Sequence, residues 1–404
     1  MNTAIHPIII GAGPAGTAAS LELSKAGIHH TIIDRASFPR HKVCGESFDG
    51  RVYHNLNRID PSLITEMRNR GIMIGSRRYA LTADSGEHLD VHFPADNAPR
   101  LHAKRYDFDH FLLQKAQATG YATVKTNTPI LKVEKEGDTW HLYGRGDERL
   151  HSTRLLLLAT GAAPKLRAAI TGLPEKPKEK QYVFVRTYYK GVRSAVDGER
   201  FTQVKFLRKP FPMVLCICPL PNDESNIEFG ISQKMWQEYK PDLKTIFDEI
   251  IGQHPDIAAQ FSHAEHIGPA RPTFMDIKPS KRHFHGEGYL LLGAAAGCVN
   301  PATGFGVGLA VMNGYEAGKQ AVAAVHADNT EAAFLAAYAE RVRKAASNQY
   351  VISAFISMIT VRPNLQRLAF RMYLKLGVVK RVFSDPKFTN YLFHPSFYLK
   401  KLFG

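Results

Sequence analysis

One stretch near the start restricts the fold more than any other: HPIIIGAGPAGTAASLELSKAGIHHTIIDR. Its three isoleucines, residues 8–10, predict a short buried strand, and residues 11–16 form the pattern G-x-G-x-x-G. Good helix formers occupy residues 17–25 and stop before Gly27, after which residues 31–33 predict a second strand. This order is that of a β-α-β unit, so we expect a parallel sheet with helices packed on it.

The glycines of this turn are the residues that a dinucleotide-binding turn requires. Gly11 permits the tight turn, Gly13 lets the backbone approach a pyrophosphate, and Gly16 allows close packing of the helix, whose N-terminus attracts the anion. Asp34 ends the second strand and accepts hydrogen bonds from ribose hydroxyls, which favours FAD or NAD over NADP. The predicted contacts are Gly11, Gly13, Pro14, Ala15, Gly16, Asp34 and Arg35.

The composition indicates a globular protein of two or three domains, with 404 residues of which 44% are hydrophobic. No signal peptide precedes the first strand, and the longest uncharged apolar run near the end, residues 350–361, is shorter than the roughly 20 residues needed to cross a bilayer. We therefore expect a cytoplasmic protein without a transmembrane helix.

The four cysteines, Cys44, Cys216, Cys218 and Cys298, are too few for a disulfide framework. Cys216 and Cys218 alternate in the run MVLCICPL, where we expect them to be core thiols that point to opposite faces of a strand. That arrangement disfavours joint metal binding, and we predict no metal site.

The positive charge is concentrated at the C-terminus. The formal net charge is +15, and residues 339–404 contain twelve Lys or Arg against Glu340 and Asp385. Residues 365–383 place an apolar stripe on one helical face and a basic row on another. Such a helix is suited to an anionic membrane surface or an acidic acyl carrier protein, or it is a cap on the domain with solvated charges. No nucleic-acid-binding motif is visible.

Three later stretches add further patterns. RYDFDHFLLQKA, residues 105–116, predicts an amphipathic helix that begins near Asp107. LLLLATGAAP, residues 155–164, predicts a buried strand followed by a turn of small residues. GYLLLGAAAGCVNPATGFGVGLAVMNG, residues 288–314, predicts a strand that ends at Gly293, then a proline-glycine turn and a helix of small residues.

With the N-terminal turn, these motifs resemble the flavoprotein group that includes geranylgeranyl reductases, hydroxylases of the p-hydroxybenzoate hydroxylase type and flavin-dependent halogenases, from residue 7 to about residue 319. The resemblance implies FAD as cofactor and an α/β fold, with an FAD-binding Rossmann-like domain of the glutathione-reductase type at residues 1–75, 100–175 and 270–338. It also implies an inserted antiparallel substrate-binding sheet at residues 76–99 and 176–269. Residues 339–404 are then a helical C-terminal segment.

The resemblance also implies roles for single residues. An arginine at the position of Arg105 reaches toward the ribityl and phosphate region of the flavin. The P-x-x-G-x-G turn points a helix N-terminus at the pyrimidine edge, where the macrodipole stabilises negative charge on the reduced flavin. The implied contacts are Arg105, Thr160, Gly161, Gly293, Ala294, Pro301, Gly304, Gly306 and Val307.

Two positions depart from the group. Ala294 stands where an aspartate accepts from a ribityl hydroxyl, and losing one acceptor costs about 0.5–1.5 kcal/mol. Phe305 stands where the reductases usually have glutamate.

The segment FPRHKVCGES, residues 38–47, combines the P-x-x-K-x-C-G of geranylgeranyl reductases with the V-G-E-S of halogenases. The resemblance puts Cys44 and Gly45 beside the isoalloxazine, with Cys44 as a catalytic candidate; the alternative is that Cys44 is a buried filler. His41 or Lys42 is a neighbour able to lower the pKa of this thiol.

The middle of the chain predicts strands at residues 80–93, 182–189, 201–206, 213–219 and 226–232, which we expect to form the substrate sheet. Its aromatic residues, among them Tyr182, Phe184, Tyr188 and Phe206, favour a hydrophobic substrate.

We therefore expect an FAD-dependent oxidoreductase, with NADPH or another reductant as electron donor, that acts on an isoprenoid, polyene or carrier-bound substrate. In a reductase, reduced flavin gives hydride to a double bond and an acid gives the proton. In a monooxygenase, a flavin C4a-hydroperoxide oxidises the substrate. With only two tryptophans the chain lacks the W-x-W-x-I-P element of halogenases. The alternative from another class is a non-catalytic module that binds flavin or lipid.

Overall fold

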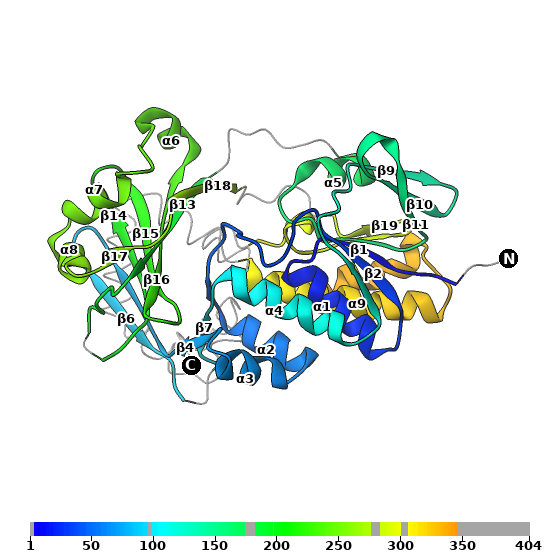
Figure 1. Ribbon diagram of the computed structural model, residues 1–404, viewed down its shortest axis with the longest axis horizontal. Helices are drawn as coiled ribbons and strands as arrows, with labels where there is room; N and C mark the ends of the chain where they lie inside the picture. The colour runs from blue at the N-terminus through cyan, green and yellow to red at the C-terminus, as the bar shows by residue number, and fades with distance from the viewer. Residues whose placement is uncertain are drawn as a thin grey trace, which may run out of the picture.

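The structure is a computed structural model that describes residues 4–95, 98–173, 182–196, 198–275, 283–299 and 306–345. Within these residues the strands form a six-stranded sheet, an eight-stranded sheet and two three-stranded sheets. Figure 1 shows the six-stranded sheet in one half of the molecule and the eight-stranded sheet in the other. This architecture confirms the predicted α/β fold class.

The six-stranded sheet is built around β1 (Ile8–Ile10), which lies between β2 (His30–Ile33) and β12 (Leu156–Leu158) and is parallel to both. Ile9 lies opposite Leu157 and Ile32, and all three are fully buried, as expected for short apolar strands covered on both faces. The sheet continues with β8 (Ala122–Lys125) beside β2 and with β20 (Tyr289–Leu291) beside β12, and β19 (His285–Gly286) pairs antiparallel with β20.

Three helices, α1 (Pro14–Lys25), α4 (Arg105–Ala118) and α9 (Val307–His326), lie side by side on one face of this sheet (Figure 1). The helix predicted at residues 17–25 is α1, which begins at Pro14 because proline is well placed in the first turn of a helix. On the other face lie α5 (Pro164–Thr171) and the three-stranded sheet of β9 (Lys132–Glu136), β10 (Thr139–Tyr143) and β11 (Arg149–Thr153) (Figure 1).

The eight-stranded sheet contains all five predicted runs. They form β5 (Arg78–Thr82), β6 (His88–His92), β13 (Tyr182–Lys190), β14 (Thr202–Leu207), β15 (Met213–Pro219) and β16 (Glu224–Ser232). Short strands β17 (Glu265–His266) and β18 (Arg271–Met275) both pair with β13. The sheet is antiparallel as expected except that β14 and β5 are parallel, a pairing that joins two segments far apart in sequence.

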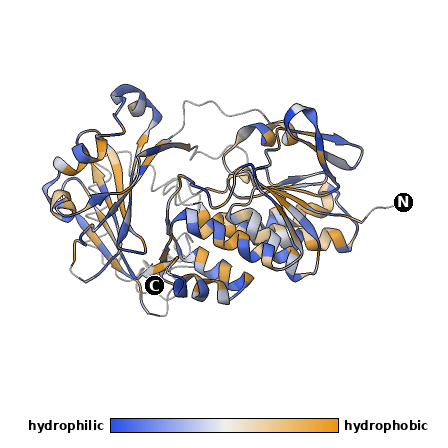
Figure 2. Ribbon diagram, in the orientation of Figure 1, coloured by the Kyte–Doolittle hydropathy of each residue, from blue (hydrophilic) through white to orange (hydrophobic). Residues whose placement is uncertain are grey.

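One face of this sheet packs on α6 (Gln233–Tyr239), α7 (Ile246–Gly252) and α8 (Pro255–Phe261) through an apolar cluster that includes Leu215, Phe229 and Ile250. Figure 2 shows these strands as alternating hydrophobic and hydrophilic bands. The opposite face points toward the six-stranded half, and Thr202 on it is hydrogen-bonded to Ser47 at 3.0 Å.

A three-stranded sheet of β3 (Ser47–Phe48), β7 (Arg100–His102) and β4 (Ile74–Ser76) lies where the two halves meet, and α2 (Gly50–Ile59) and α3 (Ser62–Asn69) lie beside it, below α4 and α1 in Figure 1.

Residues 332–345 are helical and pack on the six-stranded half. The Tyr338 hydroxyl donates to the Leu291 carbonyl at 2.7 Å, and Arg341 Nε donates to Glu316 Oε2 at 2.8 Å. This first part of the basic C-terminal segment is therefore docked, while residues 346–404, which carry most of its predicted charge, lie outside the described residues. None of the described helices has the length and apolarity needed to span a membrane.

Candidate active site

The glycine turn between β1 and α1 has the geometry that the sequence predicts. Gly11 has a φ of 109°, and a Cβ on it would lie 2.3 Å from the carbonyl oxygen of Ala159. A Cβ on Gly16 would lie 1.9 Å from the Gly11 carbonyl oxygen. Gly13 is the N-cap of α1 and gives it no side-chain cap, so the first N–H groups of the helix are open to an anion.

Asp34 lies beside this turn at the end of β2. Its Oδ2 accepts from the Ala12 N–H at 2.8 Å and its Oδ1 accepts from the Ala36 N–H at 2.9 Å. Each carboxylate oxygen keeps a lone pair for a further donor such as a ribose hydroxyl. Arg35, the next predicted contact, is exposed.

The turn after β12 lies next to the glycine turn, because the Ala159 N–H donates to the Ile10 carbonyl at 2.8 Å. Gly161 has a φ of 69°, a conformation that favours glycine. The Thr160 hydroxyl is buried and has no hydrogen-bond partner among the described residues. A buried hydroxyl without a partner is costly, so Thr160 is suited to hold a polar ligand.

The third predicted turn meets the first. Gly293 has a φ of 58°, and a Cβ on it would lie 3.3 Å from the Ala15 Cβ and 3.4 Å from the Ala310 Cβ. Its N–H donates to Asn313 Oδ1 at 2.6 Å, a contact that the sequence analysis missed. Ala294 is half-buried. Pro301 and Gly304 lie outside the described residues.

The predicted association of Cys44 and Gly45 with the start of α9 is visible as a small pocket. Both residues line it together with Asp49, Gly306 and Val307. Cys44 is half-buried, and a Cβ on Gly45 would meet nothing within 4 Å. Gly306 is the N-cap of α9 without a side-chain cap. Bare backbone at Gly45 and the N-terminus of α9 therefore border the same small pocket.

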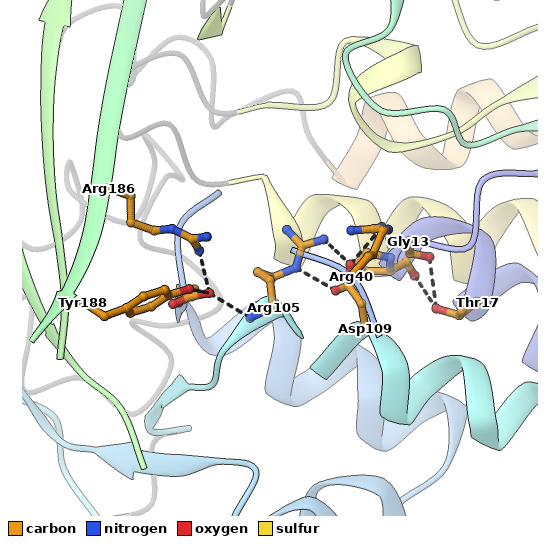
Figure 3. A network of polar contacts seen from close by, with 9 residues as sticks. Gly13, Thr17, Arg40, Arg105, Asp109, Arg186 and Tyr188 are labelled. Carbon is orange, nitrogen blue, oxygen red and sulfur yellow. Dashed lines mark hydrogen bonds and ion pairs between the residues drawn. The ribbon is translucent and has the colours of Figure 1, made fainter. Parts of the chain in front are cut away.

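A buried ionic network borders the glycine turn (Figure 3). Asp109 accepts from Arg105 Nε at 2.7 Å and from Arg105 Nη2 at 2.7 Å, and its Oδ2 lies 3.1 Å from Arg40 Nη2. A Cβ on Gly13 would lie 3.5 Å from Arg40 Nη2, and Arg40 Nη1 is buried without a partner among the described residues. Arg40 therefore borders the turn, although the sequence analysis overlooked it, while two nitrogens of Arg105 are already engaged.

A second buried cluster joins the two halves of the molecule. Glu46 Oε1 accepts three hydrogen bonds (Figure 3). The donors are the backbone N–H of Arg105 at 2.9 Å, Arg186 Nη1 at 2.6 Å and the Tyr188 hydroxyl at 2.8 Å. Arg186 and Tyr188 both come from β13. Burial raises the pKa of Glu46 above its ordinary value, and Arg186 opposes the shift. The sequence analysis named Tyr188 only for its apolar ring and missed Glu46 and Arg186.

The sheet face that contacts the pocket residue Ser47 through Thr202 is aromatic at one end and polar at the other. Every second residue of β13 lies on this face: Tyr182, Phe184, Arg186 and Tyr188. Phe206 on β14 and Val214, which lies opposite it on β15, are on the same face. A Cβ on Gly230 would lie 2.6 Å from the Phe184 ring, so this glycine lets the ring cross the next strand.

Cys216 and Cys218 belong to the same face. The prediction that they point to opposite faces is wrong, because residues two apart in a strand share a face. They lie opposite Glu228 and Asn226 of β16. Burial raises the pKa of both thiols, Cys218 to about 12, which makes them unreactive at neutral pH. The described residues contain no group of three or more His, Cys, Asp or Glu suited to hold a metal ion.

These features fit an extended dinucleotide with a flat ring. Two open helix N-termini, glycines with no room for a side chain, and the buried polar atoms of Thr160 and Arg40 without a partner among the described residues all belong to these converging turns and their borders. No single stretch of sequence holds this site; four segments build it.

Comparison with known proteins gives a consistent result. The FAD binding domain family matches residues 4–351. The digeranylgeranylglycerophospholipid reductase 1 of Methanopyrus kandleri is 26% identical over 83% of this chain and 84% of its own. The 1H-pyrrole-2-carbonyl-(peptidyl-carrier protein) brominase of Pseudoalteromonas luteoviolacea is 26% identical over 78% of this chain and 77% of its own.

Among solved structures, a geranylgeranyl bacteriochlorophyll reductase-like protein of Thermoplasma acidophilum superimposes with a TM-score of 0.76. It is 19% identical in sequence, and the match covers 98% of this chain and 95% of that one. The likeness shows a shared fold.

Proposed function

Because this chain belongs to the FAD binding domain family and is an FAD-dependent oxidoreductase, we propose that it reduces a carbon–carbon double bond of a hydrophobic substrate. The observation that carries the proposal is the pocket of Cys44, Gly45 and the α9 N-terminus, whose lining residue Ser47 is hydrogen-bonded to Thr202 on the inward face of the eight-stranded sheet, the face that also carries Phe184 and Phe206. Such a face receives an apolar chain or ring without unpaired polar groups.

We assign the cofactor contacts by position. The pyrophosphate is held at the open N-terminus of α1, between Gly13 and the side chain of Arg40, where the macrodipole and a guanidinium both favour an anion. Asp34 accepts from the adenosine ribose, and Thr160 supplies a hydroxyl near the second turn. The flavin ring occupies the pocket, where Gly45 presents bare backbone and α9 presents N–H groups.

When bound, FAD supplies hydride transfer to or from the substrate. The protein positions both partners and keeps the reacting atoms in an apolar space. Arg186 and Glu46 hold β13 against the loop of Cys44, so the sheet that receives the substrate is fixed relative to the pocket. We take NADPH, or another reductant of that class, as the electron donor.

Two relatives support a hydrophobic or carrier-bound substrate by their names, one a reductase of a geranylgeranyl lipid and the other a brominase of a carrier-bound pyrrole. Oxygenating chemistry is the second candidate, and the brominase relative favours it. Docking of a carrier protein or an anionic membrane on the basic C-terminal segment belongs to the same proposal.

The test starts with purified protein and its flavin absorbance. We expect one FAD per chain, anaerobic bleaching by NADPH or dithionite, and recovery of the oxidised spectrum when a geranylgeranyl lipid is added without air. Mass spectrometry of the lipid then shows a gain of two hydrogens. A product that gains an oxygen atom, formed only on admission of air, would replace the reductive proposal with the oxygenating one.

Gly45→Val tests the pocket, because its side chain enters open space that we assign to the flavin. We expect a folded protein that has lost its FAD. Gly252→Val is the matched control, since a Cβ there also meets nothing within 4 Å but lies at the end of α7, away from the pocket. If Gly45→Val retains FAD with unchanged affinity, the ring does not lie there.

A further inference from the structure

The guanidinium of Arg186 faces two carboxyl groups. Its Nη1 lies 2.6 Å from Glu46 Oε1, and the side chains of the pair are 2% and 0% exposed. Glu228 lies directly opposite Arg186 in the β13/β16 pair, where facing side chains are neighbours about 5 Å apart at Cβ. Two carboxyls therefore compete for one buried positive charge.

The groups around Glu228 come from several elements. Asn226 shares its strand, Cys216 lies opposite it on β15, and Arg186 and Tyr188 face it from β13. Arg271 of β18 lies opposite Arg186 on the far side and is exposed.

Glu228 is half-buried, and the Asn226 side chain is a hydrogen-bond partner that lowers its pKa. Burial, with a further contribution from the Glu46 carboxylate, raises the pKa of Glu228 to about 7 despite Arg186. The pair of carboxyls thus holds a proton near neutral pH.

An independent observation concerns Glu46. Three donors converge on its Oε1, whereas its Oε2 is buried and has no hydrogen-bond partner among the described residues. An ionised carboxylate spreads its charge over both oxygens, so a buried oxygen without a donor is costly. The cluster is therefore short of one donor, which a proton or a bound ligand would supply.

We propose that Glu228 is the acid that protonates the substrate during its reduction, with Arg186 and Glu46 as positioning residues. The inference rests on the proposed function. Glu228 shares its sheet face with Phe184 and Tyr182, where we place the substrate, and its residue is only half-buried.

One carbon of the substrate double bond receives hydride from the reduced flavin, and the electron pair left on the adjacent carbon takes the Glu228 proton. The O–H bond of Glu228 breaks as the new C–H bond forms. Arg186 stabilises the carboxylate that remains until solvent reprotonates it.

The first experiment measures the protonation state of Glu228 in the absence of substrate. Infrared spectra of the FAD-loaded protein, recorded from pH 5 to 9, are expected to show a protonated-carboxyl carbonyl band that disappears near pH 7. The band should be absent in Glu228→Gln and present in Glu265→Gln, a control at an exposed glutamate of β17 in the same sheet. If the band is missing in the wild type, or unchanged in Glu228→Gln, the proposal is overturned.

The second measurement separates proton delivery from hydride supply. In Glu228→Gln we expect NADPH to reduce the flavin at the wild-type rate while reduction of the lipid slows at least a hundredfold. The pH dependence of the wild-type rate should fall above pH 7, and Glu228→Asp should restore part of the activity. Equal loss in both half-reactions would show a structural role and contradict the proposal.

The two proposals fail differently. If no lipid is reduced by any variant but the carboxyl band behaves as expected, the proposed reductase function is wrong and the proton site stands. If the lipid is reduced normally by Glu228→Gln, the reductase function stands and Glu228 is not its acid.

Discussion

The carbonyl oxygen of Ala15 lies only 2.1 Å from the position that a Cβ would occupy on Gly314. Helix α9 therefore approaches α1 at the same residue that begins the predicted anion site, and a side chain at Gly314 would push the two helices apart. The contact is backbone to backbone and has no flexible side chain that yields.

Gly314→Ala is expected to lower the free energy of unfolding by roughly 3 kcal/mol, because overpacking against rigid backbone forces the helices to shift. FAD affinity should fall as well, since Ala15 lies in the first turn of α1. Thermal unfolding and flavin fluorescence measure the two effects. Gly252→Ala is the control and should be neutral or stabilising; a Gly314→Ala protein as stable as that control contradicts the contact.

Arg40→Gln removes the guanidinium that borders Gly13 while keeping a polar side chain of similar length. We expect FAD to bind about 10- to 100-fold more weakly, the range for losing a charge-assisted hydrogen bond to phosphate. Titration of the apoprotein with FAD, followed by fluorescence quenching, gives the Kd. Arg193→Gln, at an exposed arginine after β13, should leave it unchanged; a Kd of Arg40→Gln within twofold of wild type removes Arg40 from the site.

Ala294→Asp restores the acceptor that the resembling flavoproteins have at this place. The position is half-buried and follows Gly293, the glycine of the turn after β20. We expect FAD affinity to improve by about 0.5–1.5 kcal/mol, or roughly 2- to 12-fold. Isothermal titration checks this, and Ala294→Val, which adds volume without an acceptor, should give no gain. Weaker binding in Ala294→Asp would mean that the ribityl chain runs elsewhere.

Glu228 also makes stability depend on pH. Its pKa is raised from 4.5 to about 7 in the folded protein, so the folded state binds more protons than the unfolded state between these values. Its contribution to stability is fully present below pH 4.5 and is lost as pH rises through 7. At pH 8, Glu228→Gln should therefore be more stable than wild type by on the order of 2 kcal/mol, with little difference at pH 5. Chemical unfolding at both pH values measures this difference. If Glu228→Gln and wild type are equally stable at pH 8, the pKa of Glu228 is not raised in the folded protein.

Local patterns in the sequence predicted the nucleotide half well. Gly11 and Gly16 lie in a turn whose backbone leaves no room for a side chain, so a short sequence pattern is enough to predict them. The apolar run Ile8–Ile10 is favourable only as a strand buried on both faces of a sheet. The same holds for the strands of the eight-stranded sheet, whose approximate bounds follow from period-2 patterns and turn residues.

The cluster of Glu46, Arg186 and Tyr188 could not be found in this way. Glu46 and Arg186 are 140 residues apart, and although Glu46 stands in the segment FPRHKVCGES, nothing in that segment predicts an ion pair with Arg186. The position of Arg40 is likewise set by a distant residue, because its guanidinium pairs with Asp109 of α4 beside the glycine turn. The parallel pairing of β14 with β5 could not be predicted either, because short-range patterns predict where strands occur but not which strands are neighbours in a sheet.

Glu46 is the residue after Gly45, and its carboxylate forms an ion pair with Arg186 on β13 of the eight-stranded sheet. A displacement of the backbone at Gly45 is therefore mechanically coupled to β13 through this ion pair. If a ligand at Gly45 and a second ligand on β13 each favour one position of the Glu46 carboxylate, their binding is thermodynamically linked, and by reciprocity each changes the other's affinity by the same factor.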